Sequence, residues 1–199
     1  MQRVPSELEA QILFGKQEQR TEITYRNSEQ EIFANEQGVI FADQVEGNLD
    51  SIKKERAAIW QQRPIGSGKV YAYIKAGLLQ NGMIGNQLPE HYLSVCYMAT
   101  WLIERGISCQ VNHYGDCDLV AEFPGGLVGF EWQTAGNNDV KLLMKKRENC
   151  ENKSRRLIFT GTIEACKEIK NALNDDKIVI PRGKPLEQLL NSLIEEKLN

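Results

Sequence analysis

The sequence lacks a long hydrophobic run. No stretch approaches the ~18 consecutive apolar residues that cross a bilayer, and the N-terminus lacks the pattern of a signal peptide. We therefore expect no membrane partner and a cytoplasmic protein. The composition, 41% hydrophobic and 26% charged, is ordinary for a globular chain, and 199 residues suffice for one domain with a small accessory unit.

Metal-binding cysteine pairs and nucleophile motifs are also missing. The five cysteines are scattered and odd in number, without a C-x-x-C pair, which argues against zinc and structural disulfides and fits a reducing compartment. The two histidines, His91 and His113, lie near no recognisable serine or cysteine nucleophile. The segment Gly66-Ser67-Gly68-Lys69 is followed by valine, so it lacks the spacing of a phosphate loop.

The most informative segment runs from Gly115 to Lys146. Two apolar runs, 117–123 and 127–133, flank a Pro-Gly-Gly turn and predict a β-hairpin. Asp118 opens the first strand, Glu131 lies inside the second, and Gln133 shares the face of Glu131. Two carboxylates beside an apolar sheet are costly unless a proton or cation neutralises them, and oxygen ligands favour Mg²⁺ or Mn²⁺.

Structural roles are also open to these acids. Asp118 could cap a turn, and Asp116 competes with it, although strand alternation favours Asp118 as the first inward position. Phe130 and Trp132 direct Glu131 to the face opposite their own, so Glu131 needs a partner if that face is also covered.

The elements around the hairpin predict an α/β fold. From residue 88 the order is αβββαβαβα, with helices expected at 91–105, 140–152, 163–174 and 186–199 and strands at 107–114, 117–123, 127–133, 157–162 and 177–181. Asn137-Asn138-Asp139 is expected to cap the second of these helices. The apolar strand 157–162 fits a position covered on both faces.

This pattern resembles the PD-(D/E)xK nuclease superfamily, which carries an acid at the start of one core strand and acid-x-lysine on the next. The resemblance implies a restriction-endonuclease-like αβββαβ core with C-terminal additions, with Asp118 and Glu131 as catalytic metal ligands and Gln133 in the place of the lysine. It also implies a third metal acid, for which Glu90 is the candidate, although helix-start acids are common for dipole reasons. Lys141, or Lys145 one turn later, could supply the missing cation, unless both are surface lysines.

A basic run follows the hairpin. Residues 141–156 contain seven basic residues against two acids, a net charge of +5 in a chain of net −3. Such a run can contact phosphates, although charged helix faces are more often only solvated. The candidates for DNA binding are Lys145, Lys146, Arg147, Lys153, Arg155 and Arg156.

The N-terminal region, 1–79, is expected to be a separate accessory unit before a nuclease-like domain at 80–199. Residues 30–43 suggest a short hairpin or two weak strands, and 49–62 suggest a helix with Trp60 facing inward. Residues 63–74 suggest a hairpin around Gly66-Ser67-Gly68, and a helix followed by a hairpin is how a winged helix ends. A looser likeness over 70–135 resembles the replication-relaxation family of plasmids and integrative elements, with Tyr73, Gly77, His91, Asp118 and Glu131 in roughly the family's places.

The sequence therefore predicts a metal-dependent protein that cleaves or processes DNA in a mobile element, phage or plasmid. The alternative is a catalytically inactive nuclease-fold protein that binds DNA or another protein. A third possibility is a structural partner in a larger complex, docking through the acidic N-terminal region, and a homodimer is equally open.

Overall fold

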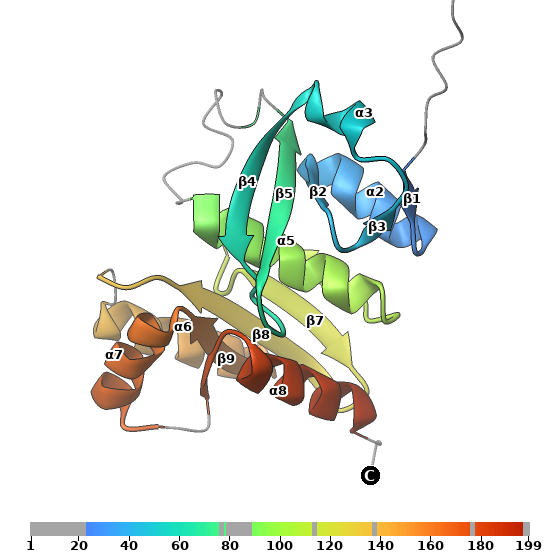
Figure 1. Cartoon of the computed structure of the whole chain (residues 1–199). Coiled ribbons are helices and arrows are strands. Elements are labelled where there is room, and N and C mark those ends of the chain that lie inside the picture. The colour runs from blue at the N-terminus through green and yellow to red at the C-terminus, as the bar shows by residue number, and fades with distance from the viewer. Residues whose placement is uncertain are drawn as a thin grey trace, which may run out of the picture.

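The computed structural model describes residues 23–75, 78, 89–112, 115–136, 139–175 and 178–196 (Figure 1). Gly77, His113, Asn137 and Asn138, which the sequence had singled out, lie outside these residues. None of the helices in the described ranges is long and apolar enough to cross a membrane.

A five-stranded mixed sheet forms the centre of the C-terminal half, with strand order β10-β9-β8-β7-β6. Its first three strands in the chain are an antiparallel meander, whereas β9 and β10 run parallel to β8. The strands are β6 (Cys109–Val111), β7 (Leu119–Phe123), β8 (Gly126–Gln133), β9 (Arg156–Gly161) and β10 (Val179–Pro181).

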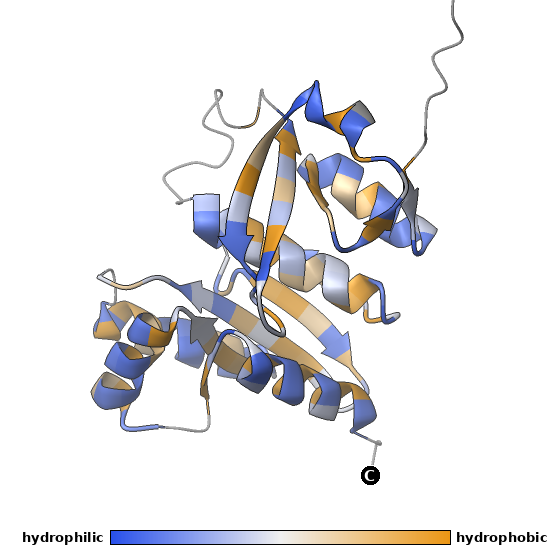
Figure 2. Cartoon of the chain, in the orientation of Figure 1, coloured by the Kyte–Doolittle hydropathy of each residue, from blue (hydrophilic) through white to orange (hydrophobic). Residues whose placement is uncertain are grey.

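Four helices cover the two faces of this sheet: α5 (Pro89–Ile103), α6 (Val140–Asn152), α7 (Ile163–Leu173) and α8 (Lys184–Glu195). One hydrophobic cluster joins α5 and α8 to Leu119, Phe130 and Trp132, and a second joins α6 and α7 to Leu157 and Phe159. Figure 2 shows the matching pattern, with hydrophobic and hydrophilic residues alternating along α7 and α8. The predicted element order αβββαβαβα is confirmed for 89–196.

The N-terminal half contains two small sheets, β1-β3 and the antiparallel β2-β5-β4. The elements are β1 (Thr24–Tyr25), α2 (Ser28–Gln37), β2 (Val39–Phe41), β3 (Val45–Glu46), α3 (Asp50–Lys53), β4 (Arg56–Gln62) and β5 (Lys69–Lys75). The hairpin predicted around Gly66-Ser67-Gly68 is confirmed, because β4 and β5 pair along their whole length across this turn.

Two local predictions in this half were wrong. Most of the 30–43 segment is helix α2 and not a pair of strands, because Asn27 caps its start by accepting a hydrogen bond from the Gln30 amide and Gly38 ends it in the left-handed conformation (φ 67°). Only Asp50–Lys53 of the 49–62 segment are helical, and its second half is strand β4, because full pairing with β5 outweighs the helical spacing. Trp60 consequently points outward and is 52% exposed.

The two halves share one hydrophobic core. Val39, Phe41 and Ile74 of the N-terminal sheet lie in the same buried cluster as Leu93 of α5 and Leu190 of α8. In Figure 1 the N-terminal sheet and α5 lie together above the larger sheet. A parallel bridge between Ile65 and Gly183 also ties the β4–β5 turn to the start of α8.

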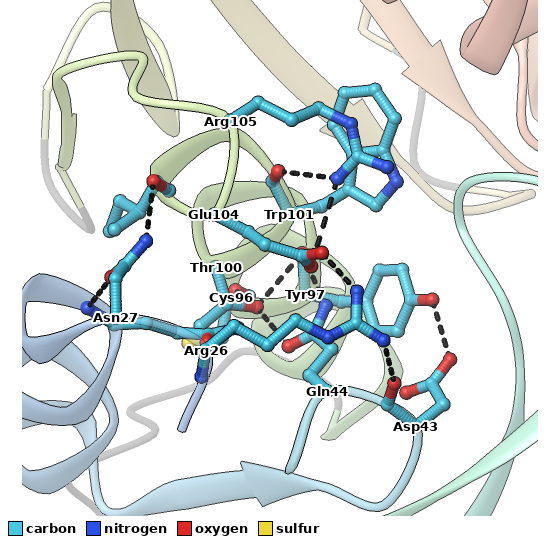
Figure 3. A network of polar contacts seen from close by, with 12 residues as sticks. Arg26, Asn27, Asp43, Gln44, Cys96, Tyr97, Thr100, Trp101, Glu104 and Arg105 are labelled. Carbon is cyan, nitrogen blue, oxygen red and sulfur yellow. Dashed lines mark hydrogen bonds and ion pairs between the residues drawn. The ribbon is translucent and has the colours of Figure 1, made fainter. Parts of the chain in front are cut away.

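Polar contacts reinforce this junction along one side of α5 (Figure 3). Thr100 donates from Oγ1 to Gln44 Oε1 at 2.5 Å, and the Tyr97 hydroxyl donates to Asp43 Oδ2 at 2.8 Å. At the end of the helix, Asn27 Nδ2 donates to the Ile103 carbonyl at 3.2 Å. These bonds satisfy buried polar groups and fix the N-terminal half against α5.

Candidate active site: the Asp118–Glu131–Lys146 cluster

Asp118 stands immediately before β7 and is held by the neighbouring strand. Its amide donates to the Phe130 carbonyl at 3.0 Å, and its Oδ2 accepts from the Trp132 amide at 2.7 Å. The β7–β8 ladder ends at the pair Leu119 and Phe130, and Asp118 lies just beyond it. Its charge is close enough to raise the pKa of Glu131. The hairpin therefore brings the two predicted acids near each other.

Glu131 is buried inside β8, with 2% of its surface exposed. Phe130 and Trp132 on either side belong to the cluster with α5 and α8, so Glu131 faces the side covered by α6 and α7. Its Oε1 accepts hydrogen bonds from Lys146 Nζ at 2.5 Å and from Gln133 Nε2 at 2.8 Å. Its Oε2 is buried without a hydrogen-bond partner.

Lys146 reaches this carboxylate from α6. The helix begins after Asp139, whose side chain accepts from the amides of Lys141 and Leu142. Lys146 is mostly buried, whereas Lys141 and Lys145 are exposed. The cation that we expected from Lys141 or Lys145 thus comes from the next residue, which lies on the buried side of the helix.

Burial controls the ionisation of the pair. Desolvation and then the charge of Asp118 raise the pKa of Glu131 to about 7, while Lys146 opposes the increase. Burial lowers the pKa of Lys146, but the Glu131 carboxylate outweighs this effect and its pKa is raised overall. A carboxyl group that titrates near neutrality, near the charge of a second acid and in contact with an ammonium group, is common in catalytic sites and also in structural ion-pair networks.

The start of α5 carries two residues that concern this site, His91 and Glu90. His91 Nε2 lies 3.1 Å from Asp118 Oδ1, an ion pair when the imidazole is protonated. The residue composition did not predict His91 as part of the site. It was named only because it occupies a place in the pattern that resembles the replication-relaxation family. Glu90, the candidate third metal acid, receives a hydrogen bond from Arg182 Nη1 at 2.6 Å.

Whether a divalent cation fits this site depends on the carboxylates of Asp118 and Glu131. Among the described residues, no three His, Cys, Asp or Glu side chains converge in a way that could hold a metal ion. Mg²⁺, however, is often bound by one or two carboxylates and completes its shell with water and substrate phosphate. The unpartnered Glu131 Oε2, beside the charge of Asp118, has the chemistry for such a ligand. Asp118 and Glu131 would hold the ion.

Much of the basic run is engaged within the protein. Besides Lys146, Arg147 pairs with Glu151 at 2.8 Å and with Asp175 at 3.3 Å, and Lys153 pairs with Asp116. The exposed members of the DNA-binding candidates are Lys145, Lys153 and Arg156, and Arg155 is half-buried. Ion pairs reduce the positive charge that this face can offer to phosphates.

Comparison of the chain with known protein families, curated proteins and solved structures found no match. The function is therefore inferred from the residues and the fold of this chain.

Proposed function

We propose that the protein is a metal-dependent hydrolase of DNA phosphodiesters, built on a restriction-endonuclease-like core. The buried Asp118–Glu131 pair with the unpartnered Glu131 Oε2 carries this proposal, because a buried acceptor beside a second acid is costly without a cation or proton. The arrangement α5-β6-β7-β8-α6-β9, with an acid before β7 and another within β8, supports it further.

Lys146 accounts for the departure from the superfamily pattern. Gln133 occupies the usual lysine position, but Lys146 from the following helix brings an ammonium group to the same carboxylate. A bound Mg²⁺ or Mn²⁺ would activate water and neutralise charge on the scissile phosphate. In that complex Lys146 stabilises the developing negative charge, Gln133 orients the Glu131 carboxylate, and His91 orients Asp118.

One observation favours a second function, a nuclease-like fold that binds DNA or protein without cleavage. Glu131 Oε1 already receives two hydrogen bonds, one from an ammonium group that compensates its charge. A protonated or ion-paired Glu131 needs no metal. The setting in a plasmid, phage or integrative element remains a prediction from sequence, and so does self-association.

Cleavage of DNA by the wild type and by Glu131→Gln separates the two functions. Linear, supercoiled and branched DNA are incubated with Mg²⁺ or Mn²⁺, and metal binding is measured by calorimetry. We expect the wild type to cut at least one form and Glu131→Gln to cut none, because the amide keeps the volume of the carboxylate but loses the charge that holds the ion.

Glu122→Gln is the matched control, since it makes the same chemical change at an exposed position of the same hairpin. It should cleave like the wild type. If the wild type cuts none of the three forms and binds neither metal, the hydrolase proposal is wrong and the binding function is favoured.

A further inference from the structure

The outward face of the β4–β5 hairpin carries an exposed aromatic pair. Trp60 and Tyr71 are directly opposite each other in the register, with ring centroids 4.2 Å apart. They are 52% and 45% exposed, and they are the only aromatic side chains in the described part of the chain that are this open. Large exposed rings gathered in one place generally indicate a binding surface.

Strand alternation identifies the other residues of this face. Val70, Ala72 and Ile74 of β5 point into the shared core. The opposite face therefore presents the remaining positions of both strands, which are Arg56, Ala58, Trp60, Gln62, Lys69, Tyr71, Tyr73 and Lys75. Three of these residues are basic, three are aromatic and none is acidic, in a chain of net charge −3. Of the three rings, only Tyr73 is buried.

The cations stand around the rings. Lys69 and Lys75 are exposed at the two ends of β5, about 20 Å apart at the usual rise of a strand. Lys53 of α3 is near enough for Tyr73 and Tyr71 to act on its pKa, but it forms an ion pair with Asp50 at 2.5 Å and adds little net charge. The open rings thus lie between positive charges that follow the direction of the strand.

We propose that this face, centred on Trp60 and Tyr71 and bordered by Lys69 and Lys75, binds single-stranded nucleic acid. Exposed rings on a sheet stack with unpaired bases, while lysines at the edges contact the backbone phosphates. Bases inside a duplex are already stacked on each other and cannot reach these rings. The face lies on the N-terminal sheet and is separate from the Asp118–Glu131–Lys146 cluster, so the inference goes beyond the proposed hydrolysis.

Fluorescence anisotropy with a labelled 30-nucleotide oligothymidylate tests the proposal. The full chain is titrated in EDTA, so that neither metal binding nor cleavage contributes to the signal. We expect Trp60→Ala to weaken binding by about 5- to 150-fold, the usual loss when one stacking ring is removed. Ile163→Ala, which truncates another exposed apolar side chain on α7, is the matched control and should leave affinity unchanged.

Charge variants provide a second test that keeps the aromatic pair intact and also covers the case in which Trp60→Ala does not fold. Lys69→Gln and Lys75→Gln should each reduce the slope of log affinity against log salt by about 0.7, whereas Lys69→Arg should preserve it. Parallel titrations with oligouridylate and with duplex DNA distinguish RNA from DNA and single from double strands.

Tighter binding of the duplex, or an affinity for single strands that survives Trp60→Ala and both glutamine variants, overturns the proposal. A second copy of the chain is the other possible partner of this face, and sedimentation at several protein concentrations detects it. A dimer that Trp60→Ala dissociates, without single-strand binding by the wild type, makes the face a self-association surface.

Discussion

The stability of the protein should depend on pH through Glu131, and Glu131→Gln should remove this dependence. The carboxyl group has a pKa of about 7 in the folded chain against an ordinary value of 4.5. The folded state therefore binds more protons than the unfolded state between these two values, and a raised acid pKa means that stability falls as pH rises through them. Below pH 4.5 the Glu131 carboxyl group is protonated in both the folded and the unfolded state, so burying it carries no ionisation cost.

The size of this change in stability follows from the same two pKa values. Each pKa unit corresponds to about 1.4 kcal/mol, so ionising Glu131 in the folded chain costs about 3 kcal/mol by pH 8. Glutamine carries no charge and avoids this cost. It leaves Lys146 without its ion pair, while the charge of Asp118 continues to favour the protonated form of Lys146, so this loss shifts the curve without removing the trend. The free-energy difference between the variant and the wild type should therefore increase by about 3 kcal/mol from pH 4.5 to pH 8.

Urea unfolding in EDTA at a series of pH values measures this difference directly. Glu122→Gln, which changes an exposed carboxyl group, should follow the wild type throughout. A difference that stays the same from pH 4.5 to pH 8 would show that Glu131 titrates as an ordinary carboxyl group. The burial argument, and with it the case for a cation beside Oε2, would then be refuted.

Two further predictions concern the same helices. Lys146→Met should abolish DNA cleavage and destabilise the fold by about 3–5 kcal/mol above pH 7, where Glu131 must either ionise without a partner or hold its proton, but by less at pH 5, where it is protonated in any case. Lys141→Met, at an exposed position of α6, should do neither, and equal effects of the two in cleavage and urea-unfolding assays would contradict the assignment. Asn27→Ala should cost about 1–2 kcal/mol in urea unfolding, because it removes the N-cap of α2 and the hydrogen bond to the Ile103 carbonyl; a change of a few tenths would show that neither bond matters in solution.

The C-terminal half was largely predictable because its local signals agree with one another. Strong periodicity, a Pro-Gly-Gly turn and a capping aspartate defined the hairpin and helices, and the hairpin brings Asp118 near Glu131. The N-terminal half was less predictable because tertiary pairing decided it. Nothing in residues 49–62 alone reveals that β5 pairs with β4 at every position.

The contact between Lys146 and Glu131 was not predicted, because it depends on the rotation of α6 about its axis. Leu143 and Cys150 are the buried residues of this helix, and Lys146 follows Leu143 by three positions and precedes Cys150 by four. This spacing puts all three on one side. The pattern was visible in the sequence, whereas the approach of that side to Glu131 depends on how the helix packs on the sheet.

The core shared by the two halves has a consequence for biosynthesis. Val39 and Ile74 share their buried cluster with Leu190 and Leu193, which follow about 120 to 150 residues later in the chain. Ribosomes add about 5–20 residues per second, so the α8 residues of this cluster are made roughly 6–30 s after the N-terminal strands. Contacts between residues so far apart in the sequence also slow folding itself. The nascent chain therefore lacks the α8 part of its core during this interval, and holding chaperones should increase its yield.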